Sequence, residues 1–365
     1  MHTPDIYRSW LERKKCLAIN TNGLDDVKTG FDVNVLNDKT WLSIPYWNQD
    51  GTAENGNDTI DKYAQQAQIE ESSAQLAEDE RIECLIVAVK APMTVRAIES
   101  VKHRLTPDST VLFLQNGMGA IEEVNEKVYP DPRHRPRYIC GLISHGLTRR
   151  EKPFQVSHTG VGTTILGSIP PAGSVSPTKD GHEDWVPSTK YLLRTLTLTP
   201  PLVAFAETPS SLMLYQLEKL AMNCVINPLT AIMNCKNGEL LYNYSFTRIM
   251  RLLLFEISSV ICALPELQGV PGIESRFSPE RLRMMVTQLA NKTAKNHSSM
   301  LQDLLSRKTT EIEYMNGYII RRGEELGIKC VVNYTIKHLV LAKHLQTKHL
   351  ESGAIPIDLL RESKM

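Results

Sequence analysis

With 365 residues, the chain is long enough for two domains that each bury a core. Its 41 basic and 41 acidic side chains cancel in formal charge. Without a basic excess, there is no sequence-level reason to expect a nucleic-acid partner. No apolar run approaches the roughly 18 residues that span a bilayer, so we expect no membrane partner either.

Seven dispersed cysteines lack any C-x-x-C pair. That spacing favours reduced thiols in an intracellular protein over a disulfide framework, and we expect no metal site. The N-terminus has no apolar signal core, although Arg8, Arg13, Lys14 and Lys15 form a weak basic patch. We therefore expect a cytoplasmic location, with a mitochondrial address as the alternative.

The first 81 residues combine short strand-like runs with a polar stretch. Strand patterns occur at 16–20 and 31–36, and turn residues follow at 37–39. Between 48 and 80 the sequence becomes polar, acidic and poor in aromatic residues, which is typical of a flexible insertion.

An alternation of strand and helix patterns begins at residue 82 and predicts an open α/β sheet. The β-branched run at 82–90 has the pattern of a strand that is buried on both faces. We expect further strands at 110–114, 138–144 and 202–206, helices at 94–104, 121–128 and 191–198, a β-hairpin formed by 154–158 and 163–167, and a loop at 168–188.

Lys90 and the Asn116-Gly117 pair each follow one of these strands. Ligands of open α/β sheets bind at the carboxyl ends of the strands, so both positions are candidates for ligand contacts. An ordinary turn at Asn116-Gly117 is the competing interpretation.

Beyond residue 208 the hydrophobic period changes from two to about 3.6. This change predicts a first domain at 1–207 and a helical second domain at 208–365, with a last helix at 333–349.

Several residues in the second half predict helix ends. Ser278 before Pro279 has the pattern of an N-cap. Thr310 and Glu313 have the spacing of a capping box, and we expect Gly327 to end the helix that they begin.

Lys219, Asn223 and Asn227 are spaced so that they form one polar stripe on a helix that is otherwise apolar. A buried cation and two buried amides are costly without partners, so the stripe faces either solvent or a ligand cleft. The pattern alone leaves both interpretations open. Pro228 removes the N–H that would bond the carbonyl of Cys224, and we expect the helix to bend beside Asn227.

Several motifs occur in a fixed order along the chain, and together they are specific although each alone would be modest evidence. They are Q-N-G-M-G at 115–119, K-L-x-x-N-x-x-I-N-P-L-T-A at 219–231, N-G-E-L at 237–240, S-S-M-L-Q-D at 298–303 and T-E-I-E-x-x-N-G at 310–317. Over roughly residues 82 to 350 the chain resembles ketopantoate reductase (2-dehydropantoate 2-reductase).

The resemblance implies NADPH-dependent reduction of 2-dehydropantoate, a 2-oxo acid, to pantoate, on the route to pantothenate and coenzyme A. The family's general acid falls on Lys219, whose ammonium would stabilise the developing alkoxide and then protonate it. The family's catalytic glutamate falls on Glu311, which would hold a substrate hydroxyl and orient the lysine. The resemblance places substrate contacts at Asn223, Asn227, Asn237, Asn296 and Ser299, and cofactor contacts at Lys90 and Asn116.

The chain departs from the family pattern before residue 82. Family members open with a strand, a G-x-G-x-x-G turn and a helix whose N-terminus binds the pyrophosphate. Gly23, Gly30, Gly51 and Gly56 are too scattered to form that turn. We therefore expect an N-terminally shortened member. Its α/β fold would have a Rossmann-like N-terminal domain without the first βαβ unit, followed by an all-helical C-terminal domain.

Two other functions stay open at this point. The chain is alternatively a non-catalytic reductase-like scaffold that acts as an interaction or regulatory protein, or a reductase of another 2-oxo acid with the same mechanism. The sequence also leaves the oligomeric state open, with a homodimer as one outcome.

Overall fold

The computed structural model describes residues 4–37, 40–44, 81–170 and 185–352. The flexible insertion that was expected at 48–80 lies outside these residues, as does most of the loop that was expected at 168–188.

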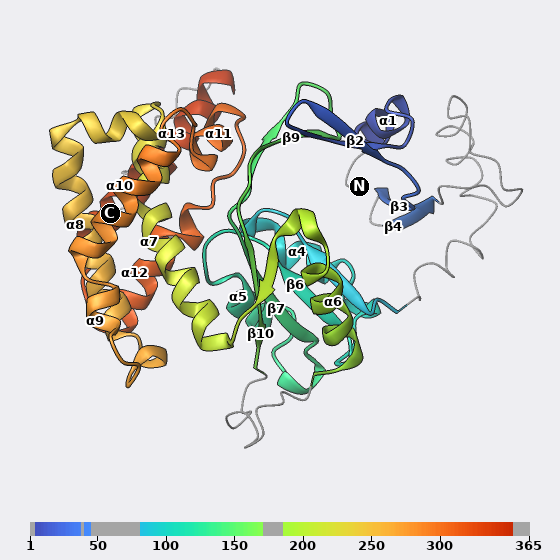
Figure 1. The fold of residues 1–365 in the computed structure, drawn as a ribbon, viewed down its shortest axis with the longest axis horizontal. Helices are drawn as coiled ribbons and strands as arrows, with labels where there is room; N and C mark the ends of the chain where they lie inside the picture. Colours follow the sequence, from blue (N-terminus) through green and yellow to red (C-terminus); the bar gives the residue numbers. More distant parts are fainter. Residues whose placement is uncertain (1–3, 38–39, 45–80, 171–184, 353–365) are drawn as a thin grey trace, which may run out of the picture. The chain divides into compact units, whose positions relative to one another are not determined.

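The chain forms two compact units, and each contains segments from several parts of the sequence. Figure 1 labels helices and strands of the chain. The strand ends and short helices that follow residues 86 and 112 group with the C-terminal helices. The first unit comprises Met1–Ile86, Ser100–Leu112 and Arg133–Ala206, and the second comprises Val87–Glu99, Phe113–Pro132 and Glu207–Met365.

Helix α1 (Pro4–Glu12) begins the first unit and was not predicted from the sequence. Its Tyr7 and Trp10 lie on one face and are only 3% and 2% exposed. The ring of Trp10 packs edge-on against Phe154, with centroids 5.0 Å apart. A nine-residue helix is marginal by itself, so this aromatic packing is what stabilises it.

A four-stranded sheet contains β1 (Leu17–Thr21), β2 (Leu24–Lys28), β8 (Gly146–Arg149) and β9 (Gln155–Gly160). Its order is β2-β1-β9-β8. The strand pattern at 16–20 is confirmed as β1, but β2 was missed because its residues are all exposed. The strand pattern at 31–36 is confirmed within the separate antiparallel pair β3 (Val33–Asn37) and β4 (Thr40–Ile44).

A five-stranded sheet contains β5 (Cys84–Val87), β6 (Thr110–Phe113), β7 (Arg137–Ile143), β10 (Thr164–Ile169) and β11 (Ala204–Ala206). Its order is β11-β10-β7-β6-β5. Hydrogen bonds from Thr110 N to Glu83 O and from Leu114 N to Val87 O advance together along both segments, as in a parallel pair.

The expectation that 82–90 forms a strand buried on both faces is wrong. β5 is an edge strand, and its Ile86 is 48% exposed. The fully buried strand is β6. An apolar run shows that a strand is hydrophobic, but it does not show the position of that strand in the sheet.

The expected hairpin of 154–158 with 163–167 is also wrong. β9 pairs with β1 and β8, whereas β10 pairs with β7 and β11. A Cβ at Gly162 would overlap with the backbone of Ser144 and His145. Gly162 therefore allows a close backbone approach where the chain passes from one sheet to the other.

Most of the helices predicted from the sequence are present in the structure. The patterns at 121–128, 191–198 and 333–349 are confirmed, whereas the helix expected at 94–104 is only six residues long and is flanked by 3-10 turns. The helices are α4 (Thr94–Glu99), α5 (Ala120–Lys127), α6 (Pro187–Thr197), α7 (Pro209–Met233), α8 (Tyr244–Ala263), α9 (Ile273–Arg276), α10 (Pro279–Lys292), α11 (Ser299–Leu305), α12 (Asn316–Glu325) and α13 (Val331–Ser352), with 3-10 turns that include η5 (Asn237–Tyr242) and η7 (Ile312–Tyr314).

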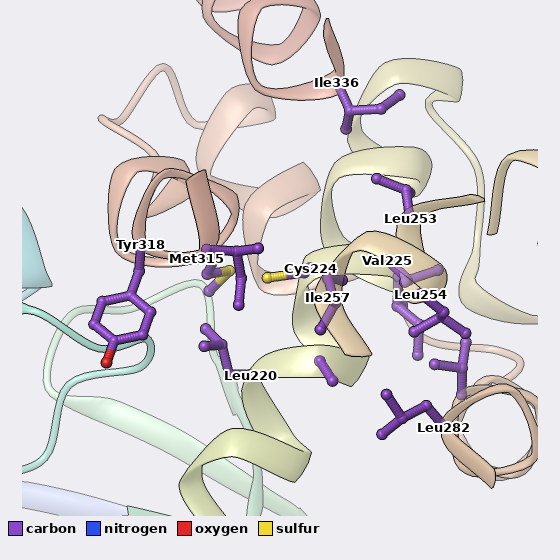
Figure 2. Close-up of a cluster of buried hydrophobic side chains, with 14 of the residues drawn as sticks. Leu220, Cys224, Val225, Leu253, Leu254, Ile257, Leu282, Met315, Tyr318 and Ile336 are labelled. Atoms are coloured by element: carbon purple, nitrogen blue, oxygen red, sulfur yellow. The ribbon is translucent and has the colours of Figure 1, made fainter. Parts of the chain in front are cut away.

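Helix α7 packs against α8, α10, α11 and α13 in the second unit. Figure 2 shows Leu220, Cys224 and Val225 of α7 among apolar side chains from neighbouring helices, and each of the three is at most 2% exposed. Full burial of one such aliphatic side chain contributes about 1.5–3 kcal/mol. The apolar faces of α7 therefore fix the direction in which its polar stripe points.

The predicted helix ends are partly right. Ser278 accepts a hydrogen bond from Arg281 N as the N-cap of α10, and Gly327 follows α12 with a φ of +71°. The capping box at Thr310 and Glu313 is wrong, because that segment forms the 3-10 turn η7 and α12 begins only at Asn316.

Candidate functional site

The polar stripe of α7 becomes more buried along the helix. Lys219 and Asn223 are half-buried, and Asn227 is 6% exposed. Asn227 Nδ2 lies 3.5 Å from Met315 Sδ, beside the segment that follows Glu311. A stripe that faces only solvent is therefore ruled out at the Asn227 end.

Lys90, just after β5, is paired with two carboxylates from the C-terminal part of the chain. Its Nζ lies 2.8 Å from Asp303 Oδ2 and 3.4 Å from Glu311 Oε2. The backbone N–H of Ala91 donates to Glu311 Oε1 at 3.1 Å. The carboxylate side chains are 9% and 3% exposed, whereas that of Lys90 is 39% exposed. The structure thus brings together two predicted site residues and adds Asp303.

Two carboxylates share one ammonium in this cluster. Burial alone would lower the pKa of Lys90, but the carboxylates of Glu311 and Asp303 together raise it. Burial raises the pKa of Asp303, with a further increase from Glu311, and these effects exceed the lowering by Lys90. The cluster therefore keeps Lys90 charged and makes Asp303 easier to protonate than an exposed aspartate.

Asn116 lies in the turn that leads from β6 into α5. Gly117 and Gly119 in this turn have φ values of +84° and +101°, which favour glycine. The N–H of Met118 donates to the carbonyl of Tyr314 at 2.8 Å. The turn that carries Asn116 therefore lies against the segment that carries Glu311.

Asn237, Asn296 and Ser299 lie on segments that adjoin α7. The N–H of Asn237 donates to the carbonyl of Asn296 at 3.0 Å. Ser299 is the first residue of α11, and the hydroxyl of its N-cap, Ser298, lies 2.7 Å from the hydroxyl of Thr230 on α7. Asn237 is buried, whereas the side chain of Asn296 is exposed.

Two buried side-chain oxygens in this region have unused hydrogen-bonding capacity. Asn237 Nδ2 donates to Thr293 Oγ1 at 2.9 Å, but no described residue donates to Asn237 Oδ1. Gln115 Nε2 donates to the carbonyl of Val87 at 3.0 Å, and within the described chain its Oε1 likewise accepts nothing. A buried acceptor without a donor costs about 1–3 kcal/mol, so a ligand hydroxyl would be stabilising at either oxygen.

Comparison with known proteins identifies the family. The chain matches the family model described as Ketopantoate reductase PanE/ApbA over residues 11–171, and the one described as Ketopantoate reductase PanE/ApbA C terminal over residues 211–344. The chain belongs to the ketopantoate reductase family. The 2-dehydropantoate 2-reductase of Vibrio cholerae is 34% identical to it over 250 residues, which are 68% of this chain and 73% of that protein.

Solved structures have the same fold. A PanE/ApbA family ketopantoate reductase from Ralstonia eutropha JMP134 gives a TM-score of 0.62 at 20% identity, with 95% of this chain and 90% of that chain covered. D-mandelate dehydrogenase, in a ternary structure with NADH and anilino(oxo)acetate, gives a TM-score of 0.60 at 18% identity, with 94% and 89% covered. The predicted fold of a ketopantoate reductase is confirmed, with Rossmann-like parallel strands and a helical C-terminal domain.

In the second unit, an ion pair connects Lys90 with Glu311 and a backbone hydrogen bond connects Asn237 with Asn296, while the roles of all the predicted site residues stay predictions. Glu311 contacts Lys90 and Ala91, and its expected effect on Lys219 is a matter for experiment.

The sequence reasoning missed Asp303 and Tyr314 as members of the site. Both lie inside motifs that carried the resemblance, and the available signal for Asp303 was an acidic residue in the short helix α11, most of whose other residues are apolar.

Two features are absent from the part of the chain that the structure describes. Among the described residues, no helix is long and apolar enough to cross a membrane. They also contain no group of three or more His, Cys, Asp or Glu side chains that could hold a metal ion.

Proposed function

We propose that the protein reduces 2-dehydropantoate to pantoate with NADPH, on the route to pantothenate and coenzyme A, and that Lys219 is the general acid. The observation that carries the proposal is the half-buried polar stripe of α7. Its lysine and first amide keep partial access to solvent, and its last amide, Asn227, contacts the segment that follows Glu311. The reductases that this chain matches, such as that of Vibrio cholerae, support the choice of substrate.

The site residues fit the nicotinamide-ribose end of a dinucleotide. Lys90, Gln115 and Asn116 gather polar groups just beyond β5 and β6, and Gln115 Oε1 is a buried acceptor with unused capacity. Ribose hydroxyls are donors of the kind that such an acceptor needs. Residues 1–365 contain no G-x-G-x-x-G sequence, so we assign no residue to the pyrophosphate.

In the proposed mechanism the protein supplies charge, orientation and one proton. When bound, NADPH supplies the hydride that converts the ketone carbon into an alcohol carbon. Negative charge then develops on the ketone oxygen, where the ammonium of Lys219 stabilises it and donates a proton. The amides of Asn223 and Asn227 and the hydroxyl of Ser299 hold the substrate, with its carboxylate at Ser299.

In this mechanism Glu311 provides a carboxylate that is held in one orientation. The N–H of Ala91 and the ammonium of Lys90 hold its carboxylate in one orientation, so little reorganisation is needed when substrate arrives. We infer that this carboxylate accepts a substrate hydroxyl and orients Lys219. Asn237 Oδ1 is a second acceptor for a substrate hydroxyl. Asn296 adjoins Asn237 through a backbone hydrogen bond.

The direct test is oxidation of NADPH by the purified protein in the presence of 2-dehydropantoate, with NADH as the comparison cofactor. We expect turnover with NADPH and a fall in kcat of about 10²–10⁴-fold for Lys219→Ala, the usual contribution of a general acid. Lys292→Ala removes an exposed lysine from α10 and is the matched control. The assignment of Lys219 is wrong if both variants keep the wild-type rate.

Substrate profiling separates the remaining functions. Reduction of another 2-oxo acid at a higher kcat/KM than 2-dehydropantoate would replace the substrate in this proposal but keep the mechanism. A protein that neither binds NADPH in calorimetry nor turns over any 2-oxo acid would be a scaffold, which the assembled motif residues do not favour. Homodimer formation and the cellular compartment remain predictions, to be measured by sedimentation and by imaging of a tagged protein.

A further inference from the structure

Tyr314 holds the Asn116–Gly119 turn at two points. Its carbonyl accepts the N–H of Met118 at 2.8 Å. Its hydroxyl donates to Glu123 Oε2 at 2.5 Å, and Glu123 lies in the first turn of α5, directly after the glycine turn. One residue therefore fixes the turn through its backbone and the following helix through its side chain.

The turn also approaches Tyr314 too closely for a side chain at Gly117. A Cβ at Gly117 would lie 2.8 Å from Tyr314 C and Tyr314 Cβ. Backbone contact this close leaves Asn116 little freedom to move relative to Tyr314.

The hydrogen bond between Tyr314 and Glu123 is strengthened by charge. Lys127 Nζ lies 2.5 Å from Glu123 Oε1, so the carboxylate is paired on one oxygen and accepts the phenol on the other. Burial on its own would raise the pKa of Glu123, but hydrogen bonds from Lys127 and Tyr314 hold it below its usual value. The acceptor is therefore ionised at neutral pH, and hydrogen bonds to an ionised group are about twice as strong as neutral ones.

Tyr314 is also hydrogen-bonded to Glu311, the proposed catalytic glutamate. The N–H of Tyr314 donates to the carbonyl of Glu311 at 3.0 Å within η7. Glu311 in turn is held by Lys90. Tyr314 therefore links the position of Glu311 to that of the Asn116 turn.

We propose that Tyr314 is a positioning residue that holds Asn116 in the geometry needed for hydride transfer, through its hydrogen bond to Glu123. This inference deepens the proposed function and rests on it. Tyr314 touches neither substrate nor cofactor in this account. It acts by fixing the turn that carries Asn116.

The test is Tyr314→Phe, which removes the hydroxyl and keeps the ring and all backbone contacts. We expect kcat with saturating NADPH and 2-dehydropantoate to fall about tenfold or more, since small misplacements of reacting groups have large effects on rate. Hydrogen–deuterium exchange should become faster in the peptide that contains Met118 and remain unchanged in α8. Tyr242→Phe, at a tyrosine that is 92% exposed, is the matched control.

Variants of Glu123 separate positioning from general stability. Glu123→Gln keeps an acceptor for the phenol and should retain most of the wild-type kcat. Glu123→Ala removes the acceptor and should lower kcat as much as Tyr314→Phe does. The double variant Tyr314→Phe/Glu123→Ala should be no slower than either single variant, because both remove the same bond. The Glu123 variants also remove the ion pair with Lys127, and Lys127→Met measures the effect of that loss alone.

Four results would overturn the inference: unchanged kcat in Tyr314→Phe, unchanged exchange at Met118 in that variant, exchange that rises equally throughout the protein, or additive effects in the double variant. The exchange measurement needs neither cofactor nor substrate. If the wild-type protein shows no reductase activity, the proposed function fails, while the exchange result still decides whether Tyr314 fixes the turn.

Discussion

Asn316 Nδ2 donates to the carbonyl of Cys224 at 3.0 Å. In a regular helix that carbonyl would accept the N–H of residue 228, but Pro228 has none. Both Asn316 and Cys224 are fully buried. A side chain from α12 therefore replaces the backbone donor that α7 lacks, at a position one turn before the buried end of the polar stripe.

The replacement donor is itself held by a buried chain of hydrogen bonds. Asn316 Nδ2 also donates to Asn333 Oδ1 at 2.9 Å, and Asn333 Nδ2 donates to Glu256 Oε2 at 2.8 Å. The backbone N–H of Asn333 donates to the same Glu256 oxygen. The chain links α7, α12, α13 and α8 and thereby fixes α7 where Pro228 interrupts its hydrogen bonding.

We expect Asn316→Ala to destabilise the protein by about 1–3 kcal/mol, because it leaves the buried carbonyl of Cys224 without a donor. Pro228→Ala restores an N–H at the position that regularly serves this carbonyl. The double variant should therefore be more stable than the sum of the single effects predicts, by about 1 kcal/mol. Urea unfolding of the four proteins gives these differences. Strict additivity would show that Asn316 and Pro228 do not act on the same carbonyl.

The sequence predicted this helix well because its signals are local. The apolar spacing around Leu220, Cys224 and Val225 specified a buried helix, and Pro228 identified the carbonyl that lacks its partner. The residue that supplies the donor, Asn316, lies 92 positions away, and no local pattern connects the two. Whether α7 bends beside Asn227, as the sequence suggested, stays a prediction.

Other expectations failed for a similar reason. The runs that became β9 and β10 have hairpin spacing, but each found its partners in a different sheet. Thr310 and Glu313 have capping-box spacing, yet Glu311 is buried against Lys90, 221 positions away, and its segment is a 3-10 turn. Long-range pairing decided these cases. Within the site, the resemblance supplied the candidates, and only the structure showed that Lys90 and Glu311 share a cluster with Asp303.

The stability that depends on Asp303 should decrease as pH rises. Burial raises its pKa above the ordinary aspartate value in the folded protein, so the folded state binds more protons than the unfolded state between the two pKa values. The contribution of Asp303 is therefore most favourable below the ordinary aspartate pKa of about 3.9 and is lost as pH rises through the raised pKa of the folded state. The free energy of unfolding of Asp303→Asn should therefore increase relative to that of the wild type as pH rises through this range.

Urea unfolding from pH 3.5 to 7 would measure this difference between wild type and Asp303→Asn. Glu280→Gln is the control, because Glu280 belongs to an exposed pair with Arg283 in which its side chain is 72% exposed. A difference that moves in the opposite direction with pH would mean that Lys90 lowers the pKa of Asp303 more than burial raises it.

Lys90→Met should destabilise the protein by about 2 kcal/mol, because it leaves the carboxylates of Asp303 and Glu311 buried without their cation. The value lies below the range for a fully buried pair, since Lys90 is 39% exposed and partly screened by solvent. Adding Asp303→Asn removes one of the two uncompensated charges and should recover part of the loss. Thermal unfolding of the single and double variants would show this, and no recovery would mean that Asp303 is not a partner of Lys90.

Gly117→Ala and Gly269→Ala form a matched pair that separates backbone strain from close packing. Both glycines have positive φ, +84° and +79°, so alanine is strained to a similar extent at either position. A Cβ at Gly269 meets nothing within 4 Å, whereas one at Gly117 would overlap with the backbone of Tyr314. We expect Gly269→Ala to lose about 1 kcal/mol of stability, the cost of the strain alone. Gly117→Ala should lose at least about 1 kcal/mol more, because the turn must move away from Tyr314.

Gly117→Ala should also lower kcat, because the displaced turn carries Asn116, while Gly269→Ala should leave kcat unchanged. Equal losses in the two variants, with kcat preserved in both, would show that contact with Tyr314 does not determine the position of Asn116.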